Sequence, residues 1–472
     1  MSVLVVGAGP TGLALACGLL EAGVPVRLVD AAPGPATTSR ALGLQPRGVE
    51  VLDRLGALGA LPERGITVGG VVINVDGRQI ARLRVGGTTP LVRRPGLMMS
   101  QAVIEKQLRK RLAELGGSIE WGHEITDLDH DGWIVGCDGA HSQVRKLAGI
   151  GFPGVPLIER FLVADVRADL PLARDAVTTW LQGDRMIALF PLPGGDLWRV
   201  LAPVPEDSDP DVSTLLAERA GLPPIRSREW TSFFRIHRRL ADTYRRGTVL
   251  LAGDAAHIHS PMGGQGMNTG LGDAENLAWK LALVVHGRAG DALIDTYEAE
   301  RRPIATEVLG NTSSMTSVML GRTPAERIMR DHVVVPLMNR PFVQRLITEA
   351  SSQLKVSYRR GPLGSPYGWV GRGPHPGDRV ADLDCARTDG TPTRLHAELR
   401  GKWAVLTGDD DAVRVAEAHL GAGSVVTLRP QRPTQTLLVR PDAHLACCGS
   451  AERLGHWLPR ALGTPRPATV AA

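Results

Sequence analysis

The chain begins with a short apolar run at 3–6, which has the length of a buried strand. A six-residue turn, Gly-Ala-Gly-Pro-Thr-Gly at 7–12, separates it from an apolar stretch at 13–20 that is long enough for a helix. A second strand-like run at 24–29 ends at Asp30. This order of strand, glycine turn, helix and strand predicts a βαβ unit at the N-terminus.

The glycine spacing of this turn is that of a dinucleotide-binding fingerprint. Gly7 would permit the tight turn, Gly9 would let the backbone approach a pyrophosphate, and Gly12 would allow close packing of helix and strand. The amides at the start of the helix would then face the phosphates. Asp30 is placed to accept hydrogen bonds from a ribose, and its charge disfavours a 2′-phosphate. At this point NAD and FAD are equally compatible with the pattern.

A second glycine-rich turn favours FAD. The apolar strand 248–252 leads into Gly253 and Asp254, and Pro261, Gly264 and Gly266 then precede a helix over 271–285. Asp254 could bind a ribityl hydroxyl. The amides at 264–268 would form a helix N-terminus that stabilises negative charge on a reduced flavin. An NAD-dependent dehydrogenase does not need this second contact.

The remaining apolar periodicity predicts three further regions. Alternating or short apolar runs at 70–90, 160–167, 176–181, 186–191 and 196–204 predict a mostly antiparallel sheet. Residues 291–354 have helical periodicity. A glycine- and proline-rich stretch at 359–377 reads as a linker, and an α/β pattern resumes from about 403 to 462.

Composition narrows the class of protein. The 472 residues are 43% hydrophobic and 22% charged, which is typical of a globular chain with two to three domains. The net charge of +5 is spread without a cluster of basic and aromatic residues, so we expect no nucleic-acid partner. Five cysteines without a C-x-x-C pair predict neither disulfides nor a zinc site, and no apolar stretch is long enough for a membrane span. We therefore expect a cytoplasmic protein without a bound metal.

Three motifs together resemble the FAD-dependent class A flavoprotein monooxygenases, the aromatic hydroxylases related to 4-hydroxybenzoate and phenol hydroxylases. They are the turn at 7–12, Val-Gly-Cys-Asp-Gly-Ala-His-Ser at 135–142, and Gly-Asp-Ala-Ala-His at 253–257 with the glycine turn that follows. The resemblance covers about residues 1–310 and points to the actinobacterial branch that acts on polyketides and antibiotics. It implies an α/β fold with a Rossmann-like FAD domain of glutathione-reductase type, an interleaved antiparallel substrate sheet and a thioredoxin-like C-terminal domain.

The resemblance also implies domain boundaries. The FAD-binding domain would comprise 1–68, 96–152 and 240–310, and the substrate sheet 69–95 and 153–239. A helical segment at 311–358 and the linker at 359–377 would lead to the thioredoxin-like domain at 378–472. Only 127–132 connects two strands that in the family flank a three-stranded meander, and this connection is too short for three strands. Either the FAD domain is shortened at this point, or a flexible segment is absent from the sequence as given.

Carried over by motif, the family's cofactor-binding roles fall on fifteen residues. The pyrophosphate would lie against the first turn, the adenosine against Asp30 and Ile125, and the flavin against the second turn. The full set is Gly7, Gly9, Thr11, Gly12, Asp30, Arg40, Gln101, Ile125, Asp138, Asp254, Pro261, Gly264, Gly266, Met267 and Asn268. No catalytic base is identified.

The activity implied is hydroxylation of an aromatic, phenolic or polyketide-like small molecule. Noncovalent FAD would be reduced by NAD(P)H, and oxygen from O₂ would reach the substrate through a flavin C4a-hydroperoxide. Two alternatives stay open: a Baeyer–Villiger or ring-opening oxygenase on the same scaffold, and a non-catalytic flavin redox sensor. We expect the C-terminal domain to be structural or to form a homodimer.

Overall fold

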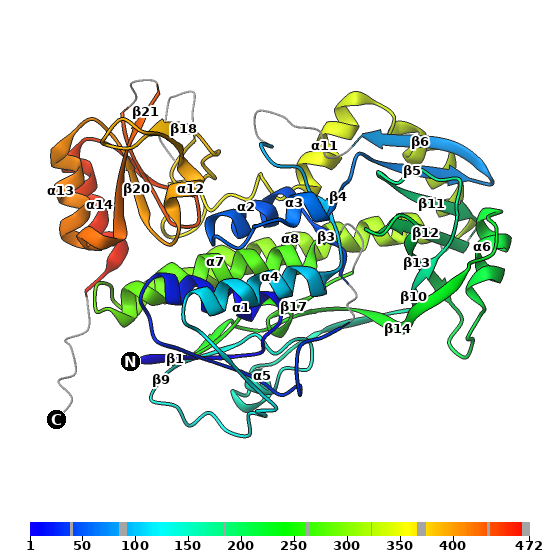
Figure 1. The fold of residues 1–472 in the computed structure, drawn as a ribbon, viewed down its shortest axis with the longest axis horizontal. Coiled ribbons are helices and arrows are strands. Elements are labelled where there is room, and N and C mark those ends of the chain that lie inside the picture. Colours follow the sequence, from blue (N-terminus) through cyan, green and yellow to red (C-terminus); the bar gives the residue numbers. More distant parts are fainter. Residues whose placement is uncertain are drawn as a thin grey trace.

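A computed structural model describes residues 1–37, 41–84, 92–183, 185–260, 264–321, 323–365, 374–431 and 435–464. Figure 1 shows three regions: a sheet near the N-terminus, a long antiparallel sheet at the opposite end, and a C-terminal domain set beside the helices that cover the first sheet. The long helices α7 (Gly266–Val285) and α8 (Ala292–Leu320) run through the middle of the molecule.

The N-terminal sheet has six strands. In spatial order they are β15 (Arg245–Arg246), β16 (Val249–Leu251), β9 (Gly132–Gly136), β1 (Ser2–Val6), β2 (Val26–Asp30) and β8 (Ile119–Trp121). All neighbours are parallel except β15 and β16. Helix α1 (Pro10–Glu21) packs against α4 (Gln101–Glu114) and α7. The central strands are buried and apolar, as a sheet with parallel strands requires.

The second sheet has eight strands in the order β17 (His257–Ile258), β14 (Ser227–Leu240), β10 (Gly154–Arg167), β13 (Leu197–Val204), β12 (Arg185–Pro191), β11 (Ala176–Gln182), β5 (Gly70–Val75) and β6 (Arg78–Arg84). Its pairs are antiparallel apart from β11 with β5. Strand β17 follows the N-terminal sheet directly along the chain, so the two sheets meet at a seam between β16 and β17.

Shorter elements complete this part of the chain. Strands β3 (Gly43–Leu44), β7 (Leu97–Met98) and β4 (Ile66–Thr67) form a small sheet. The helices are α2 (Pro46–Arg54), α3 (Leu61–Arg64), α5 (Gln143–Leu147), α6 (Val212–Ala220), α9 (Pro324–Met329), α10 (Val335–Leu337) and α11 (Pro341–Ser351), with a π-helical turn at Arg330–Val334 and a 3₁₀ turn at Gly253–Ala255.

The C-terminal domain is a third sheet with helices. Its strands follow the order β19 (Pro392–Arg394), β18 (Asp384–Ala386), β21 (Val425–Pro430), β20 (Trp403–Leu406), β22 (Thr436–Val439) and β23 (Leu445–Gly449). Strand β20 is parallel to β21 and antiparallel to β22, which pairs antiparallel with β23. Helices α13 (Asp410–Leu420) and α14 (Ala451–Leu462) pack together, and α12 (Leu395–Leu399) contacts α2. A 3₁₀ turn at Ala422–Ser424 precedes β21.

Buried ion pairs attach this domain to the rest of the chain. Arg440 donates to Glu300 of α8 at 2.8 Å, and Lys280 of α7 donates to the same carboxylate at 2.8 Å. On the other side, Arg379 donates to Glu50 of α2 at 2.9 Å. All of these side chains are buried. The ion pairs between the two parts are therefore shielded from solvent, and breaking one would leave an unpaired buried charge.

The predicted fold class is confirmed: the chain is a mixed α/β protein with a largely parallel N-terminal sheet and an interleaved antiparallel sheet. Strand β8 continues into β9 through 122–131 without an intervening strand in that described stretch. The domain boundaries stay a prediction. All five cysteines are unpaired and buried, and burial raises the pKa of Cys17 to about 12 and of Cys385 to about 11. Such thiols are poor nucleophiles.

Candidate functional site: a cavity between the two large sheets

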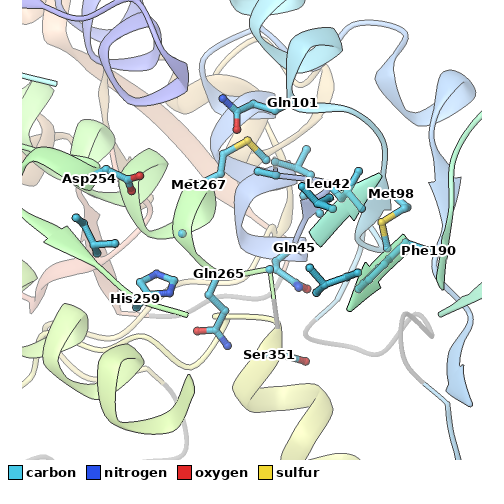
Figure 2. A pocket seen from close by; sticks show the side chains of 18 of the residues that line it. Leu42, Gln45, Met98, Gln101, Phe190, Asp254, His259, Gln265, Met267 and Ser351 are labelled. Atoms are coloured by element: carbon cyan, nitrogen blue, oxygen red, sulfur yellow. The ribbon is translucent and has the colours of Figure 1, made fainter. Parts of the chain in front are cut away.

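A cavity of about 1040 Å³ lies where the carboxyl ends of the N-terminal sheet meet the eight-stranded sheet. This exceeds the range of about 300–1,000 Å³ typical of small-molecule sites. Its wall combines the turn after β1, residues 41–46, the turn before α7, strands of the second sheet, and the ends of α8, α10 and α11. Figure 2 shows Asp254, His259 and Gln265 on one side, with Leu42, Met98 and Phe190 on the other.

The first predicted turn brings the start of α1 to this cavity. Gly7 has a φ of +103°, and a side chain on Gly12 would come within 1.9 Å of the Gly7 carbonyl oxygen, so both positions require glycine. Gly9 and Thr11 line the cavity, and a Cβ on Gly9 would meet no atom within 4 Å. Gly9 is the N-cap residue of helix α1, so no side chain caps this N-terminus. Its first amides are therefore available to an anion.

The second predicted turn brings the start of α7 to the same cavity. Gly264, Gly266 and Met267 line it, and Gly264 has a φ of +61°. Helix α7 also begins without a side-chain cap. Six other helices, α4, α5, α6, α9, α13 and α14, are capped by a side chain at their N-termini. The starts of α1 and α7, both without a side-chain cap, thus offer amides at two separate points of the cavity.

Asn268 holds this turn in place through hydrogen bonds. It is buried, its Oδ1 accepts from the Gln45 amide at 2.9 Å, and its Nδ2 donates to the carbonyl of Gly264 at 2.8 Å. The same nitrogen donates to the carbonyl of Gly43 at 3.0 Å. Asn268 is not itself part of the cavity wall. Its contribution is to hold the two cavity-lining segments, 43–45 and 264–267, at a fixed separation.

Asp254 lies in the 3₁₀ turn after β16 and is exposed to the cavity. The surrounding protein desolvates it, and this burial raises the pKa of its carboxyl group; His257 opposes the shift and the charge of Asp273 adds to it. It has no hydrogen-bond partner among the described residues. Its carboxyl group is therefore available to a hydroxyl-bearing ligand.

The Asp138 turn is placed by helix capping. The Asp138 carboxylate accepts from the amides of Gln143 and Val144 at 2.7 and 3.1 Å and does not line the cavity. Next to it, Gly139, His141 and Arg145 do line it. Arg145 donates to the carbonyl of Ala255 at 2.9 Å, which ties this turn to the one that bears Asp254.

Three other predicted residues lie at the periphery. Both carboxylate oxygens of Asp30 accept from backbone amides, of Ala8 at 2.7 Å and Ala32 at 2.8 Å, so Asp30 orders the glycine turn; contact with a ribose stays a prediction. Ile125 packs against the hydrophobic core of the N-terminal sheet, outside the cavity wall. Gln101 lines the cavity and donates to Glu105 at 2.7 Å. Arg40 and Pro261 lie outside the described residues.

The end of the cavity within the second sheet is apolar. Its wall consists mainly of aliphatic, methionine and phenylalanine side chains: Val71, Ile73, Val163, Val177, Met186, Phe190, Leu201, Phe233, Phe234, Met319, Met338 and Ile347. Arg199 reaches the wall as well, but its guanidinium donates to both oxygens of Asp165 at 2.6 and 2.7 Å. Phe190 lines the cavity, whereas Trp180 and Trp198 of the same sheet are core residues.

Sequence reasoning missed several cavity residues. Gln45 follows β3 and carries no motif that marks it. His259 lies between the Gly253–His257 motif and the glycine turn, and no motif marks it as a cavity residue. Ser351 and Ser352 come from the end of α11, a region that helical periodicity alone described. No cluster of three metal-ligating side chains occurs among the described residues, and no helix in the described part of the chain is long and apolar enough to span a membrane.

These residues fit FAD on structural grounds. The uncapped start of α1, with open space beside Gly9, suits a pyrophosphate; the uncapped start of α7 suits the electron-rich edge of a reduced flavin. Asp254 between them suits a ribityl hydroxyl. An apolar chamber extends beyond these groups and could take a second, largely hydrophobic molecule.

Comparison with known proteins agrees with this geometry. A family described as "FAD binding domain" matches residues 1–133 and 132–312, two segments that adjoin where the 122–131 connection ends. The 6-methylpretetramide 4-monooxygenase of Streptomyces rimosus is 36% identical and aligns with 95% of this chain and 90% of its own. The rifampicin monooxygenase of Streptomyces venezuelae is 32% identical, with 96% of each chain covered.

A solved structure is similar over nearly the whole length. The anhydrotetracycline hydroxylase of Streptomyces rimosus has a TM-score of 0.79 and 31% sequence identity, with 98% of this chain and 99% of that chain covered. The similarity therefore extends beyond the cofactor-binding motifs to the antiparallel sheet and the C-terminal domain.

Proposed function

The chain belongs to the FAD-binding family of monooxygenases, and from this membership we propose that it hydroxylates an aromatic, polyketide-like small molecule with NAD(P)H and O₂. The observation that carries the proposal is the two-part cavity, in which two uncapped helix N-termini and Asp254 adjoin a chamber lined by aliphatic and aromatic side chains. Relatives named for tetracycline-type and rifampicin substrates support a large, multi-ring substrate.

In this proposal the chain's own residues hold FAD along one wall. Gly9 and Thr11 would face the pyrophosphate, with Asp30 and Arg40 at the adenosine and pyrophosphate side. Asp254 would bind the ribityl chain, and Gly264, Gly266 and Met267 would support the isoalloxazine. When bound, FAD would take two electrons from NAD(P)H and pass them to O₂, so that one oxygen atom enters the substrate and the other leaves as water.

The overall reaction balances as substrate C–H, O₂, NAD(P)H and one proton giving substrate C–OH, NAD(P)⁺ and water. The part of the protein is to position the ring and to exclude water, which the apolar side chains of the second sheet would do. Helix amides at 266 and 267 would stabilise negative charge without reorganisation. This division of labour accounts for the lack of a nucleophile or catalytic dyad in the motifs.

The proposal is tested by a screen of phenols, naphthols and multi-ring polyketide aromatics for stimulated oxidation of NADH and NADPH. We expect at least one compound to stimulate oxidation and to yield a product that carries one ¹⁸O atom from ¹⁸O₂. Asp254→Ala should lose this activity, whereas Asp207→Ala, at an exposed position outside the cavity wall, should retain it. A lactone product would support Baeyer–Villiger oxygenation instead, and no stimulation by any compound would favour a redox sensor.

A further inference from the structure

His259 reaches the cavity at the seam between the two sheets. It follows β17, the edge strand whose Ile258 pairs with Arg239 of β14, and it precedes the turn that opens α7. A Cβ placed on Gly266 would lie 3.7 Å from Nε2 of His259, so the ring reaches the start of α7. Figure 2 shows the ring beside Gln265, on the cavity side that also holds Asp254. His259 is thus positioned near both the cofactor wall and the apolar chamber.

The hydrogen bonds of the ring determine its tautomer. Nδ1 lies 2.9 Å from the carbonyl oxygen of Ser260. A carbonyl only accepts, so Nδ1 must carry the proton of this bond. Burial lowers the pKa of His259 to about 4, against the opposing effect of the Ser260 carbonyl, so the ring is neutral near pH 7. The lone pair therefore resides on Nε2.

Nε2 is a buried acceptor without a hydrogen-bond partner in the described structure. Buried polar atoms of native proteins nearly always have a hydrogen-bond partner, so an unpaired one calls for a partner that is not part of the chain. The side-chain amides of Gln45 and Gln265 can turn to present either a donor or an acceptor. His259 has no such freedom, because Ser260 holds Nδ1–H. A group that pairs with Nε2 of His259 must therefore be a hydrogen-bond donor.

We propose that Nε2 of His259 accepts a hydrogen bond from an O–H or N–H group of the bound ligand and is a specificity-determining residue of the cavity. The inference rests on the proposed function, which supplies two sources of such a donor: a hydroxyl of the aromatic substrate, or an N–H or ribityl hydroxyl of FAD. A site built around a buried acceptor discriminates strongly against a ligand that lacks the donor, because the acceptor would be left unpaired.

The test compares His259→Phe, which keeps a planar ring without an acceptor, with His259→Gln, whose Oε1 can accept. His456→Phe is the matched control, because His456 is 79% exposed on α14. Apoprotein is titrated with FAD by flavin fluorescence. The holoenzyme is then titrated with 2-naphthol and with 2-methoxynaphthalene, which lacks the donor, by the change in flavin absorbance.

If the substrate supplies the donor, His259→Phe lowers the preference for 2-naphthol over its methyl ether about tenfold and leaves the Kd for FAD unchanged. If FAD supplies it, the Kd for FAD rises about tenfold and the preference is unchanged. In either case His259→Gln restores most of the loss. The inference is overturned if His259→Phe behaves as wild type in both titrations, or if both variants are equally impaired. Wild-type protein that takes up no FAD would instead refute the proposed function.

Discussion

Oδ1 of Asp273 lies 2.7 Å from Nε of Arg301, in a buried ion pair between α7 and α8. The other oxygen of Asp273 accepts from the backbone amide of Gly253 at 3.0 Å and lies 2.7 Å from Nε2 of His257. Burial alone would raise the pKa of Asp273, but Arg301 and His257 hold it below its ordinary value. The charged carboxylate thereby fixes the turn that presents Asp254 to the cavity.

Replacing Arg301 by methionine should both destabilise the protein and weaken its binding of FAD. The change leaves the carboxylate of Asp273 buried without its main partner, which costs about 3–5 kcal/mol of unfolding free energy. Urea unfolding followed by circular dichroism measures this loss. Arg414→Met is the control, because its ion pair with Asp411 is exposed, and it should change the unfolding free energy by less than about 1 kcal/mol. If both variants lowered the unfolding free energy equally, the role assigned to Arg301 would be wrong.

Asp254→Ala should weaken FAD binding without unfolding the chain. The side chain has no hydrogen-bond partner among the described residues, so its removal breaks no internal hydrogen bond there. A lost hydrogen bond to a ribityl hydroxyl should raise the Kd for FAD about tenfold to a hundredfold. Fluorescence titration of the apoprotein measures this, with Asp207→Ala as the control. An unchanged Kd would exclude Asp254 from the cofactor site.

The glycines of the first turn should respond in opposite ways to alanine. A Cβ at position 12 would collide with the Gly7 carbonyl at 1.9 Å, so Gly12→Ala should lower the melting temperature strongly or prevent folding. A Cβ at position 9 meets nothing within 4 Å and points into open space. Gly9→Ala should therefore keep the wild-type melting temperature of the apoprotein and lose affinity for FAD. Normal FAD binding by Gly9→Ala would place the pyrophosphate elsewhere.

Stability should fall in acid because of two buried carboxylates. Burial would raise the pKa of Glu50 and Glu300, but cationic partners outweigh it, chiefly Arg379 and Arg54 for Glu50 and Arg440 and Lys280 for Glu300. Each pKa is lowered from 4.5 to about 2. The unfolded chain thus binds more protons between these values, and the stabilisation, present in full above about pH 5, is lost as the pH falls toward 2.

Each group contributes on the order of 3 kcal/mol to this loss. Urea unfolding between pH 3 and pH 7 measures it, and Glu300→Gln should be less stable at pH 7 with a shallower decline in acid. A wild-type unfolding free energy that stays constant from pH 6 to pH 3.5 would contradict the assignment.

Much of the fold and part of the site could be predicted from local sequence. The turns at 7–12 and 264–267 were found because a tight turn and a close backbone approach require glycine, and these requirements are visible as spacing. The strands of the second sheet are visible as alternating or short apolar runs, because the residues of each strand are partly or wholly buried. In each case the physical constraint acts on neighbouring residues, so a linear pattern preserves it.

Residues whose role depends on distant partners could not be found in this way. The carboxylate of Asp138 accepts a hydrogen bond from an amide at the start of α5, and that of Asp30 accepts from the amides of Ala8 and Ala32. The spacing of residues in the sequence does not reveal these hydrogen bonds. Burial keeps the ring of His259 neutral, and the hydrogen bond from Nδ1 to the Ser260 carbonyl leaves its lone pair on Nε2. The chamber residues of α10 and α11 reach the cavity through tertiary packing of helices that carry no motif.

The most direct test of the account is the cofactor content of the purified protein. Acid or heat denaturation should release FAD into solution, and absorbance should give one FAD per chain with none left attached to the polypeptide. Apoprotein should regain the flavin spectrum when FAD is added. A colourless protein that takes up no FAD under any of these conditions would contradict the central claim.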